Sequence, residues 1–476
     1  MADLLFAPLY LALLFAQWRI KEPFTRCHAI FFLLFCPLLH FATFATGQVT
    51  STYSPYGNVT ANLIVFSYVA LFFVGALILS RHLPHASEVA ALASRVTATA
   101  VSLALLAWIA VKLYLVAKYG VSGFIALGSI AGEERLLFIE PLDAAVSTYA
   151  GYFAVGAAVA YFIRVVSGSI KWNHPTGVLV AIFLATYVIT GETPLGARRF
   201  ILLLAILCLL IALVKRSSHV TGKSSRARLY QLIKLIILSA MLAGGFSVYY
   251  QLIRNNFYSE QNAQRLLSGE PLAMLAAIAD SMVPSNDSNF ASEEQAQLRP
   301  GPFELLGTLS DRLLDGRRTS EGEITLRSAQ TVIPRLLMTR DKESFSTDIF
   351  ISAAFDVEPE GPYLEPDLPM SLAAIFLADF GFLGVPIAPI IMLLAIGLMS
   401  YTLKRLGAMS AAYVIVILGA MFQMIGIVEG ELIAFLAVFR EFIALIVLVS
   451  LGRTLLAVVR EVLIYSTARK AALTRQ

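Results

Sequence analysis

The sequence predicts an all-α polytopic membrane protein, with about 11 (10 to 12) transmembrane helices and one large outer loop of short helices. Of the 476 residues, 58% are hydrophobic and 14% are charged, whereas a soluble domain of this length needs more charge to cover its surface. The apolar residues form long blocks rather than amphipathic stripes, and most charges stand between the blocks. These observations indicate a chain that crosses a membrane many times.

The apolar blocks are the predicted spans, and most can cross a core of about 30 Å at about 1.5 Å per residue. They cover residues 3–17, 27–46, 61–80, 96–117, 143–164, 175–191, 200–214, 230–250, 379–403, 409–428 and 432–452. The first and seventh blocks are the shortest. The first block lacks a basic leader and a small-residue cleavage site, so we interpret it as a span and not as a removed signal.

The connections between the spans predict their orientation, because Lys and Arg crowd every second connection. The basic residues are Arg19, Lys21 and Arg26, then Arg81 and Arg95, Arg164 and Lys171, Lys215, Arg216, Lys223, Arg226 and Arg228, Lys404 and Arg405, and, in the tail, Arg453, Arg460, Arg469, Lys470 and Arg475. The connection 47–60 has none. This positive-inside pattern predicts an outer N-terminus and a cytoplasmic C-terminus.

The same pattern divides the chain into three parts. Spans one to eight occupy residues 1–250, a large loop occupies 251–370, and the last three spans with a cytoplasmic tail occupy 371–476. In a bacterial inner membrane the large loop is then periplasmic. Phe303, Leu306, Leu309 and Leu313 recur in it at helical spacing, which predicts an amphipathic helix on or near the membrane surface.

A second, less regular amphipathic stretch surrounds Pro271 in the loop, with apolar residues at Leu267, Met274, Leu275 and Ile278. The three cysteines, Cys27, Cys36 and Cys208, all lie in or beside apolar blocks, so no disulfide framework is expected. The chain contains no CxxC or HExxH pattern. We therefore expect neither a metal nor another cofactor.

The histidines are also unevenly placed. Five of them, His28, His82, His85, His174 and His219, are predicted on or near the cytoplasmic side, whereas His40 falls in the second span. The predicted outer loop has none. A general base on the outer side would then be a carboxylate, unless the reaction needs no dedicated base.

Two basic positions stand at the outer ends of spans, against the positive-inside pattern. Arg198 and Arg199 form a pair where the seventh span begins, and Arg254 directly follows the eighth. Each side chain can simply extend to the membrane interface. Arginine also binds phosphate through a bidentate fork, so the alternative is a site for a lipid diphosphate at headgroup depth.

The large loop ends in a basic segment followed by an acidic one. Pro334, Arg335, Arg340 and Lys342 stand among apolar residues, and the Pro-Arg-Leu-Leu core is too apolar for a fully exposed loop. A solvated charge run is the alternative interpretation. The following acidic, proline-rich turn, which contains Glu365, is either a rigid loop at the mouth of an active site or a solvated loop.

Asp379 comes next, inside an apolar stretch beside two glycines. It is a candidate acid/base or a partner for an arginine, with helix capping as the alternative.

Charges also stand in or at the start of the last span. Glu429 and Glu431 precede it, and Arg440 lies about 14 Å farther along the helix, near the middle of the membrane. Charges at this depth are costly and usually paired. Arg440, with Glu441 or with a carboxylate on another helix, is therefore either a structural pair or part of a polar cavity.

Several of these segments resemble the Wzy-type oligosaccharide repeat-unit polymerases. The likeness consists of Ile333-Pro-Arg-Leu-Leu followed by Lys342, then Pro369-Met-Ser-Leu and Asp379-Phe-Gly-Phe-Leu-Gly, and the boundary Gly196-Ala-Arg198-Arg199. It covers the general architecture and about 60 residues of loosely matching motif. The chain departs from the family where Asp379 replaces a common Asn, and where Ala373 or Ala374 replaces the usual Glu.

The resemblance implies a membrane glycosyltransferase of the GT-C type that needs no metal. It would join glycan repeat units carried on undecaprenyl diphosphate into O-antigen, capsule or exopolysaccharide. Its partners would be the lipid-linked donor and acceptor, membrane lipids and, where the system has one, a chain-length regulator, with no nucleic acid.

A departing diphosphate is best stabilised by prepositioned cations, so roles follow for the residues above. Arg198, Arg254 and Arg335 are predicted to contact the diphosphate or sugar, with Arg199, Arg340 and Lys342 in support. Asp379 or Glu365 is the predicted acceptor-activating carboxylate.

Two other functions stay open. One is the related O-antigen ligase, which transfers finished glycan to lipid A–core and relies on a histidine in its outer loop. The other is a flippase or other transporter of lipid-linked oligosaccharide. Arg440 with Glu429 and Glu431 would be explained by that function. Transporters, however, usually show repeats and broken helices.

Overall fold

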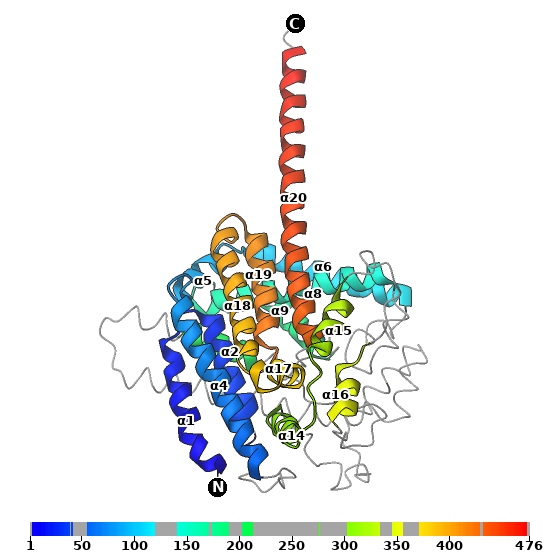
Figure 1. Ribbon diagram of the computed structural model, residues 1–476. Helices are drawn as coiled ribbons and strands as arrows, with labels where there is room; N and C mark the ends of the chain where they lie inside the picture. Colours follow the sequence, from blue (N-terminus) through cyan, green and yellow to red (C-terminus); the bar gives the residue numbers. More distant parts are fainter. Residues whose placement is uncertain are drawn as a thin grey trace, which may run out of the picture.

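The computed structural model describes residues 2–38, 40, 55–119, 140–170, 174–189, 202–212, 276, 302–333, 345–355, 371–428 and 432–473. Every regular element within these ranges is a helix (Figure 1). Five helices are long and apolar enough to cross a membrane, and shorter apolar helices accompany them. An all-helical, multi-pass membrane protein is thereby confirmed, while the total of about 11 spans stays a prediction.

Helices from the two ends of the sequence form an upright layer (Figure 1). They are α1 (Ala2–Ala16), α2 (Pro23–Leu33), α4 (Pro55–Leu79), α18 (Ile387–Leu406), α19 (Ala411–Ile425) and α20 (Leu432–Leu473). His28 on α2 joins two neighbours, because its Nδ1 lies 3.0 Å from the Ile425 carbonyl and its Nε2 3.1 Å from the Tyr68 hydroxyl. His28 is fully buried, and its place on or near the cytoplasmic side stays a prediction.

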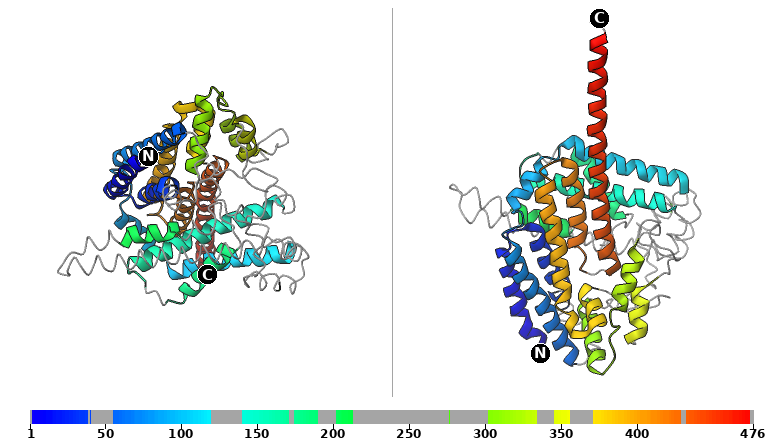
Figure 2. Two further views of the ribbon diagram at one scale, coloured as in Figure 1. Left: turned by 90° about the horizontal axis from the view of Figure 1, so that it is seen from below. Right: turned by 45° about the horizontal axis from the view of Figure 1, so that its top comes forward.

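A second layer crosses the first. It consists of α6 (Ala98–Tyr119), α8 (Pro141–Val166) and α9 (Thr176–Ile189), which lie across the view in Figure 2 (left) while α20 is seen nearly end-on. The helices of the two layers therefore do not share one membrane normal. The layers meet where α8 touches α19, and a Cβ at Gly419 would lie only 2.3 Å from the Tyr152 carbonyl oxygen. Glycine at this position allows the two backbones to touch.

Three predicted spans coincide closely with long apolar helices: residues 61–80, 96–117 and 143–164 match the candidate spans Val59–Leu79, Ala98–Tyr119 and Leu142–Val166. The ninth span was wrong at its start, since α18 begins at Ile387 and not at residue 379. The last helix continues to Leu473 as one element of 42 residues, so the predicted tail after residue 452 is helical. The predicted eighth span, 230–250, lies outside the described residues.

Three of the predicted basic connections meet at one end of the molecule, around α5 (Ala86–Ser94). Lys404 at the end of α18 lies 3.5 Å from Glu88, and Arg95 donates to the Ala408 carbonyl. Arg164 at the end of α8 donates to the Val96 carbonyl at 2.5 Å. Segments that the charge pattern assigns to one side of the membrane are thus neighbours in space.

Four shorter helices lie below and beside the upright layer in Figure 1: α14 (Pro302–Leu314), α15 (Glu323–Val332), α16 (Thr347–Phe355) and α17 (Leu372–Phe380). The predicted amphipathic helix is confirmed in α14, where Phe303, Leu306 and Leu309 are buried. This face packs against α4 and α17. Its position on or near the membrane surface stays a prediction.

Candidate functional site

Asp379 is the one predicted site residue that the structure describes, and it lies at the C-terminal end of α17 with no exposed surface. The helix begins at Ser371, whose side chain accepts a hydrogen bond from the Ala374 amide at 3.2 Å. A serine in this position stabilises the first turn. The helix directs Asp379 inward, toward the residues that open α15.

The Asp379 carboxylate accepts four hydrogen bonds from the start of α15 and the turn before it. Its Oδ1 accepts from the Ser320 hydroxyl at 2.6 Å and from the Ile324 amide at 3.0 Å. Its Oδ2 accepts from the Thr325 amide at 2.8 Å and from the Thr325 hydroxyl at 2.5 Å. A negative charge at a helix N-terminus is favourable, so Asp379 caps α15 from a distant part of the chain.

The glycines after Asp379 make this cap possible. Gly381 has φ 60° and ψ −151°, a conformation that is essentially restricted to glycine. At Gly384 a Cβ would lie 1.9 Å from the Phe376 carbonyl oxygen. The Asp-Phe-Gly-Phe-Leu-Gly segment is therefore a tight turn that returns the chain against α17 and leads into α18.

The other end of α15 is held by Arg440 of α20. Arg440 Nη1 donates to the carbonyl of Val332, the last residue of α15, at 2.8 Å. Its Nε donates to Glu441 Oε1 at 2.9 Å, and its Nη2 forms an ion pair with the same oxygen. The predicted pairing with Glu441 is confirmed, whereas the contact with α15 was not predicted.

A histidine and a glutamate pair beside α14. His40 Nδ1 contacts Glu304 Oε1, and the His40 ring stacks on Phe303 with centroids 4.1 Å apart. Both members of the pair are buried. The sequence predicts His40 in the second span, and the predicted outer loop contains no histidine. The structure places His40 against α14, a helix of the segment predicted to be the outer loop. No local sequence pattern indicates this contact.

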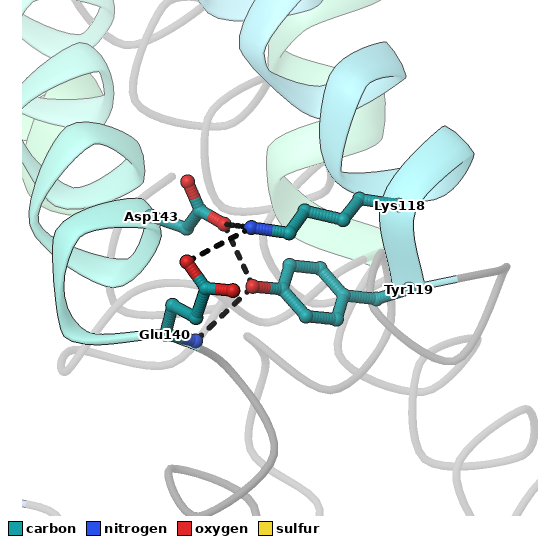
Figure 3. A network of polar contacts seen from close by, with 4 residues as sticks. All are labelled: Lys118, Tyr119, Glu140 and Asp143. Atoms are coloured by element: carbon teal, nitrogen blue, oxygen red, sulfur yellow. Dashed lines mark hydrogen bonds and ion pairs between the residues drawn. The ribbon is translucent and has the colours of Figure 1, made fainter.

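Polar and charged residues also connect the C-terminal end of α6 to the N-terminal end of α8 (Figure 3). Lys118 Nζ lies 2.8 Å from Asp143 and 3.0 Å from Glu140, and the Tyr119 hydroxyl donates to Asp143 at 2.7 Å. Deeper in the same helix pair, the buried Lys112 ammonium donates to the Ser147 hydroxyl at 3.0 Å. No sequence motif marks either cluster, although an intramembrane lysine is itself a signal of function.

Most predicted site residues lie outside the part of the chain that the structure describes. They are Arg198, Arg199, Arg254, Arg335, Arg340, Lys342 and Glu365. Their roles stay predictions, as does the role of Asp379 in activating an acceptor. What the structure shows for Asp379 is the capping contact, in which both carboxylate oxygens are engaged.

Comparison of the chain with protein-family models, with curated proteins and with solved structures finds no match.

Proposed function

We propose that this chain is a membrane glycosyltransferase that polymerises glycan repeat units carried on undecaprenyl diphosphate, at the periplasmic face of a bacterial inner membrane. A hydroxyl of the acceptor unit attacks the anomeric carbon of the donor chain. The bond from that carbon to the lipid diphosphate breaks, and the diphosphate leaves with the electron pair. The product is a surface polysaccharide such as O-antigen, capsule or exopolysaccharide.

The observation that carries the proposal is the anchoring of α15 at both ends by charged residues of other elements. Asp379 caps its first turn, and Arg440 holds the carbonyl of its last residue, Val332. Arg335 follows Val332 by three residues, and three residues of chain span at most about 11 Å. The Pro-Arg segment is thus tethered to a helix that two other helices hold in place.

Such anchoring suits a site that stabilises a leaving diphosphate. Cations lower the barrier when they are held in place before charge develops, because no reorganisation is then needed. In this proposal Arg335 binds the diphosphate together with Arg198 and Arg254, with Arg199, Arg340 and Lys342 in support. Asp379 acts through α15 as a positioning residue.

Deletion of the gene in its host tests the function. We expect the polymer ladder on a surface-glycan gel to collapse to single repeat units attached to their normal acceptor. Polymer accumulating on undecaprenyl diphosphate would indicate a ligase instead, and repeat units retained in the cytoplasm would indicate a flippase.

Point variants test the site. Arg335→Ala and Arg198→Ala should each abolish polymerisation while the protein still inserts into the membrane. Arg318→Ala is the matched control, because Arg318 is an exposed cation in the described part of the loop. Full activity of both site variants would refute the diphosphate clamp.

One observation supports the ligase as a second candidate. Ligases of the related family rely on an outer histidine, and His40 lies against Phe303 and Glu304 of the loop helix α14. His40 is buried, so for this role it would have to become accessible to the acceptor. The deletion phenotype above separates the two enzymes.

A further inference from the structure

Glu441 is a buried acidic residue whose two carboxylate oxygens have different surroundings. Its side chain is 7% exposed, and Oε1 takes both contacts from Arg440. Its Oε2 is buried without a hydrogen-bond partner in the described part of the chain. A buried acceptor that lacks a donor costs about 1–3 kcal/mol, so a neighbouring hydroxyl, an ordered water or a ligand is expected to donate to it.

Arg440 makes the other half of this site and is more open. Its side chain is 40% exposed, although it lies eight residues, or about 12 Å, into the apolar helix α20. A guanidinium has five N–H groups. Three of them are engaged by Glu441 and Val332, which leaves two donors without an assigned partner among the described residues.

The surroundings are polar and aromatic. Tyr149 and Tyr152 of α8 lie within electrostatic range of both Arg440 and Glu441, and the Tyr149 hydroxyl is also within hydrogen-bonding range of the Glu441 carboxylate. Tyr152 is also close to Tyr187, whose hydroxyl accepts a hydrogen bond from Gln423 Nε2 at 2.8 Å. Gln423 Oε1 is a second buried acceptor without a partner in the described ranges. Helices α19 and α20 thus each carry a buried acceptor oxygen without a described partner, and α20 also carries two donors of Arg440 without an assigned partner.

This combination identifies the class of ligand. The diphosphate diester of a lipid-linked glycan supplies only acceptors at neutral pH and would repel Glu441, so it suits Arg440 alone. A sugar hydroxyl donates and accepts at once. It can donate to Glu441 Oε2 and accept from Arg440. The pair carries no net charge, which suits a neutral polyhydroxyl ligand.

We propose that Glu441, held by Arg440, binds the attacking hydroxyl of the acceptor sugar and receives its proton. The inference rests on the proposed function and assigns its acceptor-activating carboxylate. As the hydroxyl oxygen forms the new glycosidic bond, its proton passes to Glu441 Oε2. The bond between the anomeric carbon and the diphosphate breaks in the same step, and Glu441 later returns the proton to solvent. Asp379, whose oxygens both serve α15, keeps its positioning role.

Purified full-length protein in lipid nanodiscs, supplied with lipid-diphosphate-linked repeat units, provides the test. Glu441→Gln keeps the shape of the side chain but cannot take a proton. We expect kcat to fall at least 100-fold with KM changed less than threefold, since general-base catalysis contributes about 10²–10⁴ in rate. The acidic limb of the pH–rate profile should disappear, and formate should restore part of the activity of Glu441→Ala.

Two controls accompany these variants. Glu88→Gln removes a carboxylate that also pairs with a cation, 3.5 Å from Lys404, but on α5 among the basic connections, and it should keep wild-type kinetics. Arg440→Gln combined with Glu441→Gln replaces the ion pair by a neutral pair, so that no uncompensated charge stays buried. This double variant should fold and be at least as slow as Glu441→Gln, because it also loses the Arg440 contact with the Val332 carbonyl at the end of α15.

The outcomes separate the inference from the function it rests on. If wild-type protein polymerises and Glu441→Gln keeps its rate and pH profile, Glu441 contacts only water or other residues of the protein. The inference is then wrong, while the proposed function stands. If wild-type protein does not extend the lipid-linked units, the proposed function itself fails.

Discussion

At the scale of single residues, Asp379 illustrates how a buried charge is used. Four donors converge on one carboxylate, and two of them are backbone amides at the start of a helix. These amides have no partner within the helix itself. The carboxylate therefore links α15 to α17 without an opposing cation among its described contacts.

Asp379→Asn tests this link. The amide nitrogen of Asn would face two donors and leave them without an acceptor, so we expect a loss of about 1–3 kcal/mol in unfolding free energy. The measurement is the denaturation midpoint of purified protein in micelles. Asp315→Asn, at an exposed position after α14, should change the unfolding free energy by less than about 0.5 kcal/mol. Equal midpoints for Asp379→Asn and wild type would contradict the capping role.

At the scale of elements, the crossing of α8 and α19 depends on two glycines. A Cβ at Gly156 would lie 1.7 Å from the Ile415 carbonyl oxygen, and one at Gly419 would meet Tyr152. Neither contact involves the end of a flexible side chain that can move aside. The two helices must therefore separate if either glycine gains a side chain.

Gly419→Ala should destabilise the protein by about 1–3 kcal/mol or more, because overpacking at a backbone contact forces the helices apart. Gly151→Ala is the matched control on α8, since a Cβ there has nothing within 4 Å, and alanine favours a helix by up to about 1 kcal/mol. Thermal unfolding in detergent measures both. A Gly419→Ala protein as stable as Gly151→Ala would show that the helices do not touch in solution.

Among the elements, α14 was predicted correctly from the sequence, whereas the start of the ninth span was not. The period of Phe303, Leu306 and Leu309 predicted α14 because the residues of one helical face are close in sequence. It did not predict the partner of that face. The ninth span was misplaced because the apolar stretch continues through α17, whereas the chain turns at Gly381, and hydropathy alone carries no information on φ.

The site was less predictable than the fold, for a related reason. Asp379 and Arg440 were recognised as unusual charges, but both bind α15, which is distant from them in sequence. Thr325 is 54 residues from Asp379, and Val332 is 108 residues from Arg440. His40 and Glu304 are 264 residues apart. No local spacing encodes such contacts, and the free oxygen of Glu441 becomes visible only when its neighbours are in place.

At the scale of the whole molecule, the two ends of the upright layer have different characters. The basic connections around α5 gather at one end, and α14 and α17 lie toward the other (Figure 1). The positive-inside rule assigns the first end to the cytoplasm. We therefore expect the described loop helices to be accessible from outside the cell membrane.

Labelling with a membrane-impermeant maleimide tests this orientation. In spheroplasts Asp315→Cys should react at once, whereas Met409→Cys, an exposed position at the basic end, should react only after permeabilisation. Cys27 and Cys36 are buried and Cys208 is partly buried, so a Cys208→Ser background keeps the native signal low. The opposite labelling pattern would invert the topology.

The anchoring of α15 also has a consequence for biosynthesis. Its C-terminal carbonyl is bound by Arg440, which the ribosome adds 108 residues later. Until α20 has been made and inserted, only Asp379 can hold this helix, and before α17 not even Asp379 is available. Contacts of such long sequence separation form late in folding. A chain truncated before α20 would thus insert its earlier spans yet leave the helix that precedes Arg335 without its C-terminal anchor, so activity would arise only after synthesis is nearly finished.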